Sequence, residues 1–236
     1  MNVLISGADR GLGFALTKKM LERGYIVFAG QYLPDWKELE KLKQQYEKTL
    51  HIIPMDVALD ESVKNASIDV GKIVDKIDIL IGNAAIIGWG PDVVEDLTDT
   101  QMMAEVYIVN TIGNVRLFEY FLPLIQKGCE RRICFISSEA GSVGQCERSY
   151  FFWYGMTKSA LNYYAKVMFN RYRPAGFKFR LYHPGWIKSY MKGELDDLAK
   201  LTPDEAATYA MDYFFDQIVD EDQLVLRGYD GEVFKF

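Results

Sequence analysis

The chain begins with Met1-Asn2-Val3-Leu4-Ile5-Ser6 and continues into Gly7-Ala8-Asp9-Arg10-Gly11-Leu12-Gly13. An apolar strand, a glycine turn and an amphipathic stretch with Leu12, Leu16 and Met20 at helical spacing follow one another directly. Glycine allows a tight turn and a close backbone approach, and the helix behind it offers unpaired amides to a pyrophosphate. The pattern predicts a dinucleotide-binding turn with GxxxGxG instead of GxGxxG spacing; the alternative is a purely structural turn.

Short apolar runs continue to alternate with longer amphipathic stretches along the whole sequence. Seven strands are expected, at residues 3–6, 25–29, 50–54, 77–82, 132–137, 178–183 and 223–226. Strands that alternate with helices indicate βαβ units and a parallel sheet. No linker, repeat or low-complexity stretch divides the chain. The sequence therefore predicts one α/β domain over residues 1–236, a doubly wound Rossmann domain with a seven-stranded parallel sheet flanked by helices.

The composition excludes several classes of function. With 49% apolar residues and a net charge of -6, the chain is globular and has no basic field for nucleic acid or anionic membranes. Its apolar runs fall short of the roughly 18 residues that a membrane helix needs, and its first residues leave no space for a leader, so a cytoplasmic protein is expected. Two distant histidines and three cysteines without ligand spacing predict no metal site and no Ser-His-Asp hydrolase.

The cofactor preference is inferred from the end of the second strand. It reads Gly30-Gln31-Tyr32, without the acid that usually binds the ribose hydroxyls of NAD, and Arg10 in the glycine turn suits a 2′-phosphate. NADP(H) is therefore favoured, and NAD(H) is possible. The alternative is a solvated arginine and a glutamine of no consequence. Asp56 could accept a hydrogen bond from the adenine amino group, or it could cap the following helix.

A phenol and an ammonium group are expected to share one helix face. Tyr154-Gly155-Met156-Thr157-Lys158 places them four residues apart. A nearby cation stabilises the phenolate of a tyrosine, which ordinarily titrates at about 10, so Tyr154 could give a proton to a carbonyl oxygen. The alternative is a chance pair on a helix surface.

Two further polar residues support the catalytic interpretation. Ser138 follows the fifth strand, at the carboxyl edge where open α/β sheets assemble their sites, and could donate to the same oxygen. Asn110 lies within a long apolar helical stretch, where an unpaired amide is costly. It is either a helix kink or core hydrogen bond, or the holder of a water that connects Lys158 to solvent.

Together these motifs resemble the short-chain dehydrogenase/reductase family, in order and over nearly the whole chain. They are the glycine turn, Gly82-Asn83-Ala84-Ala85, Asn110, Ser138, Tyr154 with Lys158, and His183-Pro184-Gly185-Trp186-Ile187. The HPGW run, the final Gly228-Tyr229-Asp230-Gly231-Glu232 and the long spacing from Ser138 to Tyr154 are most similar to its sniffer- and C-factor-like carbonyl reductase branch.

The resemblance implies roles for individual residues. Tyr154 would be the acid/base, Lys158 would bind the nicotinamide ribose and lower the tyrosine pKa, Ser138 would position the substrate oxygen, and Asn110 would complete a proton relay. The implied cofactor site has a glycine-rich turn at 6–13 and comprises Ser6, Gly7, Asp9, Arg10, Gly11, Leu12, Gly13, Gln31, Asp56, Val57, Asn83, Ala84, Tyr154, Lys158, Pro184, Gly185, Ile187 and Ser189. Within it, Asn83 would steady the sheet, and the backbone of Ile187 would meet the carboxamide.

Some positions depart from the family pattern. Ser6 replaces the usual threonine and keeps the hydroxyl, and Gly82 and Ala85 replace the first and last residues of NNAG. Ser189-Tyr190 stands where the branch usually has Thr-Asp, so the loop after the HPGW turn is expected to be arranged differently.

The predicted function is an NADP(H)-dependent oxidoreductase that transfers a hydride between nicotinamide and a carbonyl or alcohol carbon, with a catalytic segment at 138–158 and a substrate loop at about 186–200. Two alternatives remain: a catalytically weak dinucleotide-binding sensor or interaction protein, and an NAD-dependent alcohol dehydrogenase. A small apolar or aromatic carbonyl substrate is expected from the residues that border the pocket, namely Ile86, Ile87, Trp89, Glu139, Gln145, Phe152, Trp153, Trp186 and Tyr190. The resemblance also implies a homodimer or homotetramer associating through helices around 99–126 and 152–171.

Overall fold

A computed structural model describes residues 1–88, 98–191 and 193–236. Within these ranges, eight strands form one sheet in the order β3-β2-β1-β4-β5-β6-β7-β8. The strands are β1 (Asn2–Ile5), β2 (Ile26–Gln31), β3 (Leu50–Pro54), β4 (Ile79–Gly82), β5 (Arg132–Ile136), β6 (Lys178–His183), β7 (Leu226–Gly228) and β8 (Val233–Phe234). The first seven are parallel, which confirms the predicted doubly wound sheet.

The predicted number of strands was one too low. β8 pairs antiparallel with β7 through Leu226–Phe234 and Arg227–Val233. The two strands are joined by the turn at Tyr229–Glu232, where the N–H of Gly228 donates to the Glu232 carbonyl at 2.7 Å. A two-residue strand is too short to show the alternation by which strands are recognised in a sequence.

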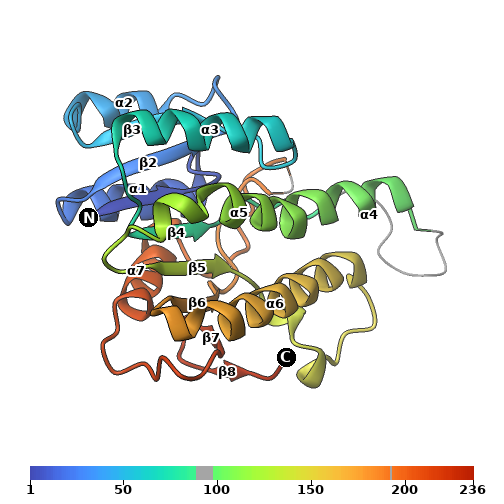
Figure 1. Cartoon of the computed structure of the whole chain (residues 1–236). Helices are drawn as coiled ribbons and strands as arrows, with labels where there is room; N and C mark the ends of the chain where they lie inside the picture. Colours follow the sequence, from blue (N-terminus) through green and yellow to red (C-terminus); the bar gives the residue numbers. More distant parts are fainter. Residues whose placement is uncertain (89–97, 192) are drawn as a thin grey trace.

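Helices cover both faces of the sheet (Figure 1). They are α1 (Gly11–Glu22), α2 (Glu38–Gln45), α3 (Asp60–Ile73), α4 (Thr100–Tyr107), α5 (Gly113–Ile125), α6 (Phe152–Tyr172) and α7 (Pro203–Phe214), with a π-helix η2 (Ile108–Ile112) between α4 and α5. Short 3-10 turns complete the described elements: η3 (Glu139–Gly141), η4 (Val143–Gln145) and η5 (Arg173–Ala175).

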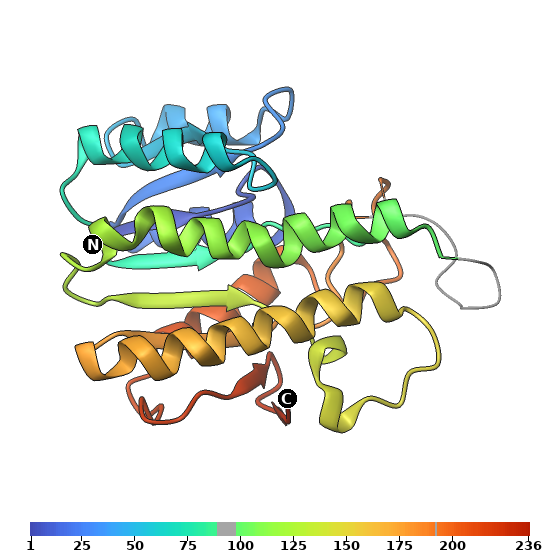
Figure 2. The same ribbon diagram turned by 45° about the vertical axis from the view of Figure 1, so that its right-hand side comes forward.

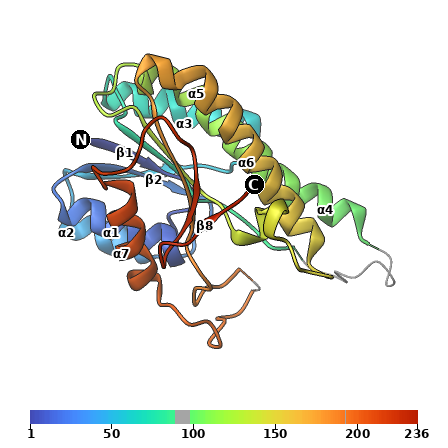
Figure 3. The same cartoon turned by 90° about the horizontal axis from the view of Figure 1, so that it is seen from below.

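The view from below shows α1, α2 and α7 on one side of the sheet and α3, α5 and α6 on the other (Figure 3). The alternation of side chains along each strand supplies both cores. In β1, Val3 and Ile5 belong to the cluster under α1 and α7, whereas Leu4 belongs to the cluster under α3, α5 and α6. The central strands are therefore apolar on both faces, as expected of a buried parallel sheet.

The continuous helical layer formed by α4, η2 and α5 lies beside α6 and passes the carboxyl edge of the sheet (Figure 2). Because all the parallel strands end at this edge, the residues that follow β1, β4, β5 and β6 are brought together there. In the described parts of the chain, no helix is long and apolar enough to span a bilayer.

Candidate active site

The glycine turn leaves the start of α1 open. Arg10 is the N-cap of α1 but makes no capping bond with its side chain, and the first turn of the helix contains no acid. Gly11 has φ of +56°, and a Cβ there would meet nothing within 4 Å. Gly13 has no such room, because a Cβ would lie 2.1 Å from the Gly7 carbonyl oxygen. The turn thus combines a close backbone approach with a free, positively polarised helix end.

Ser6 and Asn83 attach this turn to the neighbouring strand. The Ser6 hydroxyl oxygen accepts from the backbone N–H groups of Asn83 at 3.0 Å and Ala84 at 3.1 Å. Nδ2 of Asn83 donates to the carbonyls of Ser6 at 3.0 Å and Gly7 at 2.9 Å. Serine provides the hydroxyl that this arrangement uses. Both N–H groups of the Asn83 side-chain amide thus form hydrogen bonds that link the end of β4 to the end of β1.

Asp9 has a supporting contact that the sequence analysis missed. Its carboxylate is only 4% exposed and accepts from the backbone N–H groups of Tyr32 at 3.1 Å and Leu33 at 2.9 Å. Asp9 therefore fixes the loop after β2 against the glycine turn. Hydrogen bonds from backbone donors to an ionised carboxylate are stronger than those to neutral acceptors.

The Arg10 side chain packs between the loop after β2 and the predicted substrate loop and is not freely solvated. Its Nη2 donates to the Tyr190 carbonyl at 3.3 Å, and its Cζ lies 5.1 Å from the centre of the Trp36 ring and 5.5 Å from that of Tyr190. The two rings meet edge to face, 5.0 Å apart. A cation between aromatic rings is stabilised by their quadrupoles. Arg10 thus joins the glycine turn to the loop after β2 and to the predicted substrate loop.

The end of β2 does have an acid beside it. Nε2 of Gln31 donates to Oε1 of Glu40 on α2 at 3.4 Å, and Oε2 of Glu40 is buried without a hydrogen-bond partner among the described residues. The absence of an acid in the sequence Gly30-Gln31-Tyr32 did not predict this contact, because Glu40 comes from the next helix. The environment of Gln31 therefore contains a carboxylate.

Asp56 lies in the turn that precedes α3. Its carboxylate accepts from the N–H of Ala58 at 2.8 Å, and its own N–H donates to Ser62 at 2.9 Å. The N-cap of α3 is Leu59, so the prediction that Asp56 could cap the helix was wrong. Val57 is buried, and its carbonyl accepts from Arg116 at 3.1 Å.

Tyr154, Lys158 and Ser138 come together at the ends of β5 and α6. Nζ of Lys158 donates to the Ile136 carbonyl at 2.9 Å and lies 5.5 Å from the centre of the Tyr154 ring. The side chains of Ser138 and Tyr154 form a hydrogen bond. Ser138 also accepts from the N–H of Ala140 at 3.1 Å, which fixes the serine at the start of η3.

Burial controls the protonation of both titratable groups. It raises the pKa of Tyr154 above the ordinary value, the nearby Glu139 carboxylate raises it further, and the hydrogen bond with Ser138 acts in the opposite direction. Burial lowers the pKa of Lys158 to about 8. The expectation that Lys158 depresses the pKa of Tyr154 is therefore not met here, because the ammonium group is directed to the Ile136 carbonyl and the ring. At neutral pH the phenol is protonated and the lysine is charged.

Asn110 braces the helices around the tyrosine. Its Oδ1 accepts from the N–H of Ile86 at 2.8 Å, and its Nδ2 donates to the Ile86 carbonyl at 2.8 Å and to Oγ1 of Thr157 at 3.1 Å. Thr157 in turn donates to the Tyr154 carbonyl at 2.8 Å. The side-chain amide thus makes core hydrogen bonds, one of the two roles expected for it, and its role in holding a water stays a prediction. Asn110 lies in the π-helix η2, an irregularity that is frequent at functional sites.

A second amide holds the end of β5 to α6 and was not predicted. The hydroxyl of Ser137 donates to Oδ1 of Asn162 at 2.6 Å, and Nδ2 of Asn162 donates to the Gly141 carbonyl at 3.1 Å. Asn162 lies one turn beyond Lys158 on α6. The YxxxK pattern, continued by one further helical turn, is the signal that could have identified it.

The turn after β6 opens the predicted substrate loop. Gly185 has φ of +78°, and a Cβ there would lie 2.7 Å from the Tyr229 ring, so the Pro184-Gly185 turn requires glycine. Ile187 pairs with Leu201 in a parallel bridge that closes the loop. Within the loop, the carbonyl of Ser189 accepts from the N–H of Asp196 at 3.0 Å.

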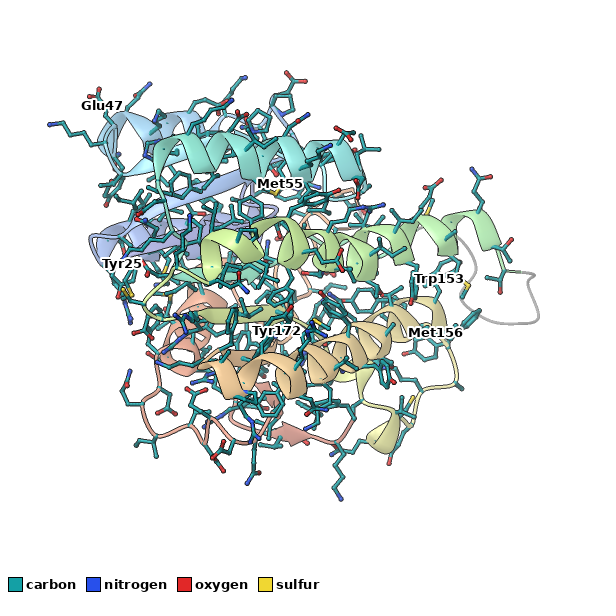
Figure 4. The ribbon with its side chains drawn as sticks, in the orientation of Figure 1. Tyr25, Glu47, Met55, Trp153, Met156 and Tyr172 are labelled. Carbon is teal, nitrogen blue, oxygen red and sulfur yellow. The ribbon has the colours of Figure 1, made fainter. Side chains whose placement is uncertain are left out.

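The expected pocket residues separate into several groups. Trp153, at the start of α6, is 2% exposed and belongs to the core, so its assignment to the pocket was wrong (Figure 4). Gln145 accepts from the N–H of Lys235 at 2.6 Å and lies beside the C-terminal residues. Trp186 is half exposed, Phe152 is half-buried, and Trp89 lies outside the described residues. A hollow of about 400 Å³ is lined by Glu139, Gln145, Glu147, Arg148, Ser149, Tyr150, Glu232 and Phe234.

The strand order, the open glycine turn and the Ser138-Tyr154-Lys158 cluster define an oxidoreductase of the Rossmann class. The family model described as short chain dehydrogenase matches residues 1–199. The chain belongs to the short-chain dehydrogenase/reductase family.

Relatives and solved structures agree with this assignment. An uncharacterised oxidoreductase of Schizosaccharomyces pombe is 32% identical, over 98% of this chain and 96% of its own. The NADPH-bound carbonyl reductase from chicken fatty liver has a TM-score of 0.88 at 29% identity, with 100% of this chain and 98% of that chain covered. The Sniffer carbonyl reductase of Drosophila melanogaster shares the fold, with a TM-score of 0.87 at 23% identity over 100% and 99% of the two chains. Among solved structures, the fold of the chain is thus similar to that of two carbonyl reductases.

The residues present fit a nicotinamide dinucleotide. The uncapped start of α1 and the open side of Gly11 suit a pyrophosphate, for which backbone N–H groups at a helix end are the usual ligands. The protonated phenol and the charged lysine lie at the same edge of the sheet, at the end of β5.

Proposed function

We propose that this protein is an NADP(H)-dependent carbonyl reductase in which Tyr154 gives a proton to the substrate oxygen. The observation that carries the proposal is the Tyr154 phenol, which burial keeps protonated while it is hydrogen-bonded to Ser138 next to the charged Lys158. A protonated acid at neutral pH is the form that reduction of a carbonyl requires.

The remaining residues would orient and stabilise. The bound nicotinamide supplies or accepts the hydride. Ser138 would hold the substrate oxygen within reach of the phenol, and Lys158 would bind the nicotinamide ribose. Asn110 would fix the backbone of Tyr154 relative to that of Ile86, because its amide bonds to Ile86 and to Thr157, which in turn bonds to the Tyr154 carbonyl. Gly7, Gly11 and Gly13 would bring the backbone to the phosphates.

The preference for NADP(H) over NAD(H) rests on Arg10. A guanidinium group pairs well with a phosphate, and Arg10 lies in the glycine turn next to the loop that follows β2. The carbonyl reductase from chicken fatty liver that this chain resembles was solved with NADPH bound. Glu40, beside Gln31, acts against a 2′-phosphate and is the residue that would favour NAD(H) instead.

We also propose an apolar carbonyl substrate and a symmetric dimer or tetramer. Trp186, Leu195 and Leu198 are exposed on the substrate loop, at 50%, 40% and 83%. On the outer face of α6, Met156, Tyr163 and Val167 are exposed at 49%, 74% and 41%. Sedimentation at several concentrations tests the assembly, and a strict monomer would contradict it.

The function is tested with the Tyr154→Phe variant and a panel of aromatic and aliphatic aldehydes and ketones. Purified protein should oxidise NADPH faster than NADH with members of the panel. The variant should lose about 10²–10⁴-fold in turnover, the usual contribution of a general acid, and should still bind NADPH. Unchanged turnover would remove the mechanism. Failure of the wild-type protein to bind either dinucleotide would favour a sensor or interaction protein.

A further inference from the structure

The ring of Phe151 stacks on the ring of Tyr154, and a charged pair lies behind it. The two rings are 5.1 Å apart and inclined by 26°. Cζ of Arg148 lies 5.9 Å from the centre of the Phe151 ring, and Nη2 of Arg148 pairs with Oε1 of Glu139. Glu139 is the residue after Ser138. The loop from Ser138 to Phe151 is therefore closed on itself by one ion pair, and both of its ends touch Tyr154.

The backbone of Phe151 indicates that this stacking is imposed. Phe151 has φ of +63° and ψ of +39°, which places a bulky residue in the left-handed region immediately before α6. Such a conformation is unfavourable for any residue other than glycine, asparagine or aspartate, and it persists only where the surroundings enforce it. The contacts of its ring with Arg148 and Tyr154 are the surroundings that the structure provides.

The two charges act on Tyr154 in opposite directions. Glu139 raises the pKa of the phenol by repelling the phenolate, and Arg148 lowers it by attraction. Three more titratable groups lie in this environment: Lys158 on α6, His183 on β6 and Asp230 in the turn between β7 and β8. His183 interacts electrostatically with Asp230, and also with Glu139 and Arg148. Of these five groups, only Glu139 and Arg148 lie in the loop between Ser138 and Phe151.

We propose that Glu139 and Arg148 are positioning residues for Tyr154: their ion pair holds Phe151 against the tyrosine and sets the pH range over which the site exchanges its proton. The inference rests on the proposed function, because it assumes that Tyr154 is the acid/base. It assigns a purpose to the long spacing between Ser138 and Tyr154. That spacing accommodates a loop whose two charges balance each other beside the phenol.

Because Glu139 and Arg148 act on Tyr154 in opposite directions, removing either charge should shift the pH midpoint of turnover in opposite directions. Arg148→Gln leaves Glu139 unopposed and moves the pH midpoint of turnover upward, by roughly one unit, the low end of the shifts that a nearby charge causes. Glu139→Gln leaves Arg148 unopposed and moves the midpoint downward. The double variant returns close to the wild-type midpoint, and Arg148→Lys, which keeps the charge, shifts it less than Arg148→Gln. A residue with a merely structural role would change kcat without moving the midpoint.

The experiment measures kcat and kcat/KM against pH, in the reductive and oxidative directions, with a carbonyl and its alcohol chosen from the panel. Glu47→Gln is the control, because Glu47 is an exposed carboxylate that follows α2, does not line the hollow beside Glu139 and Arg148, and should leave the profile unchanged. Thermal unfolding of each variant verifies folding. Phe151→Leu should lower kcat several-fold at constant midpoint.

The outcomes separate the two claims. Turnover that is lost in Tyr154→Phe, together with opposite shifts in Arg148→Gln and Glu139→Gln, supports the inference. Turnover that is lost in Tyr154→Phe while both midpoints stay in place, or move in the same direction, overturns the inference and leaves the proposed function standing. Turnover that survives in Tyr154→Phe overturns the proposed function and the inference with it.

Discussion

The ammonium group of Lys158 lies 5.5 Å from the centre of the Tyr154 ring and donates to the Ile136 carbonyl at 2.9 Å. Lys158 is only 1% exposed. Among the described residues, no carboxylate forms a hydrogen bond or ion pair with it. Burying a cation without a counter-ion is unfavourable, and the pKa of Lys158, lowered to about 8, reflects that cost. The site therefore retains a group that opposes folding.

Replacing this lysine should separate stability from activity. We expect Lys158→Met to raise the free energy of unfolding by about 1–3 kcal/mol at pH 7, since a shift of one pKa unit corresponds to ~1.4 kcal/mol and the hydrogen bond to Ile136 is lost. Turnover should fall by two or more orders of magnitude. Denaturant unfolding and steady-state assays measure the two effects. A variant that is less stable than the wild type at pH 7 would contradict this account.

The difference in stability between Lys158→Met and the wild type should depend on pH, because the pKa of Lys158 differs between the folded and unfolded states. The pKa of Lys158 falls from 10.5 in the unfolded chain to about 8 in the folded protein. Between these values the unfolded chain binds a proton that the folded protein does not, so the contribution of Lys158 to stability rises with pH. The advantage of Lys158→Met should be full below pH 8 and should shrink as the pH approaches 10. Paired unfolding curves at pH 6, 8 and 9.5 provide the measurement.

Arg10→Gln should weaken the binding of NADPH much more than that of NADH. A charge-assisted hydrogen bond contributes about 1.5–3 kcal/mol, so roughly a tenfold to hundredfold loss is expected for NADPH. Titrations followed by nicotinamide fluorescence give both dissociation constants. Glu40→Gln is the complementary variant and should favour NADPH. Equal losses for the two cofactors would mean that Arg10 supports the turn through Trp36 and Tyr190 and does not read the phosphate.

Gly13→Ala should damage the glycine turn. The added Cβ would lie 2.1 Å from the Gly7 carbonyl oxygen and 2.6 Å from Nδ2 of Asn83, so the backbone or the Asn83 bracket must move. Dinucleotide affinity should fall at least tenfold, which corresponds to about 1.4 kcal/mol. Gly71→Ala is the control, because a Cβ in that position on α3 meets nothing within 4 Å and should stabilise the protein by about 0.5–1 kcal/mol.

Thr157→Val tests the brace between η2 and α6. The substitution keeps the shape but removes the hydroxyl that accepts from Nδ2 of Asn110 at 3.1 Å and donates to the backbone carbonyl of Tyr154 at 2.8 Å. Leaving the Asn110 amide without this partner should cost about 1–3 kcal/mol of stability. We also expect kcat to fall more than the binding of NADPH. If kcat and stability both remain at the wild-type level, the brace has no part in the site.

The sequence predicted the fold well because its signals are local. The alternating strands and helices and the glycine turn after β1 are each recognisable within a few residues. β8 was missed because Val233 and Phe234 are too short a run to show a pattern. Tyr154 and Lys158 were recognised by their spacing and Ser138 by its position after a strand, and the three lie together in space.

What the sequence did not predict are contacts between distant segments. The approach of Glu40 to Gln31 depends on where α2 packs, and the pairing of Arg148 with Glu139 depends on how one loop folds back. The amide of Asn110 was recognised as costly, but the partners that satisfy it, Ile86 and Thr157, lie 24 and 47 residues away. Pairings of this kind are decided by tertiary packing, for which a single sequence carries no periodic signal.

The position of β1 between β2 and β4 has a consequence for synthesis on the ribosome. β1 is made first, but the strand on its other side begins at Ile79 and the amide that locks its turn is Asn83. Until those residues emerge, one edge of β1 is unpaired, and unpaired edges are sites of aggregation. The glycine turn, although encoded in the first thirteen residues, therefore reaches its final shape only after a third of the polypeptide has left the exit tunnel.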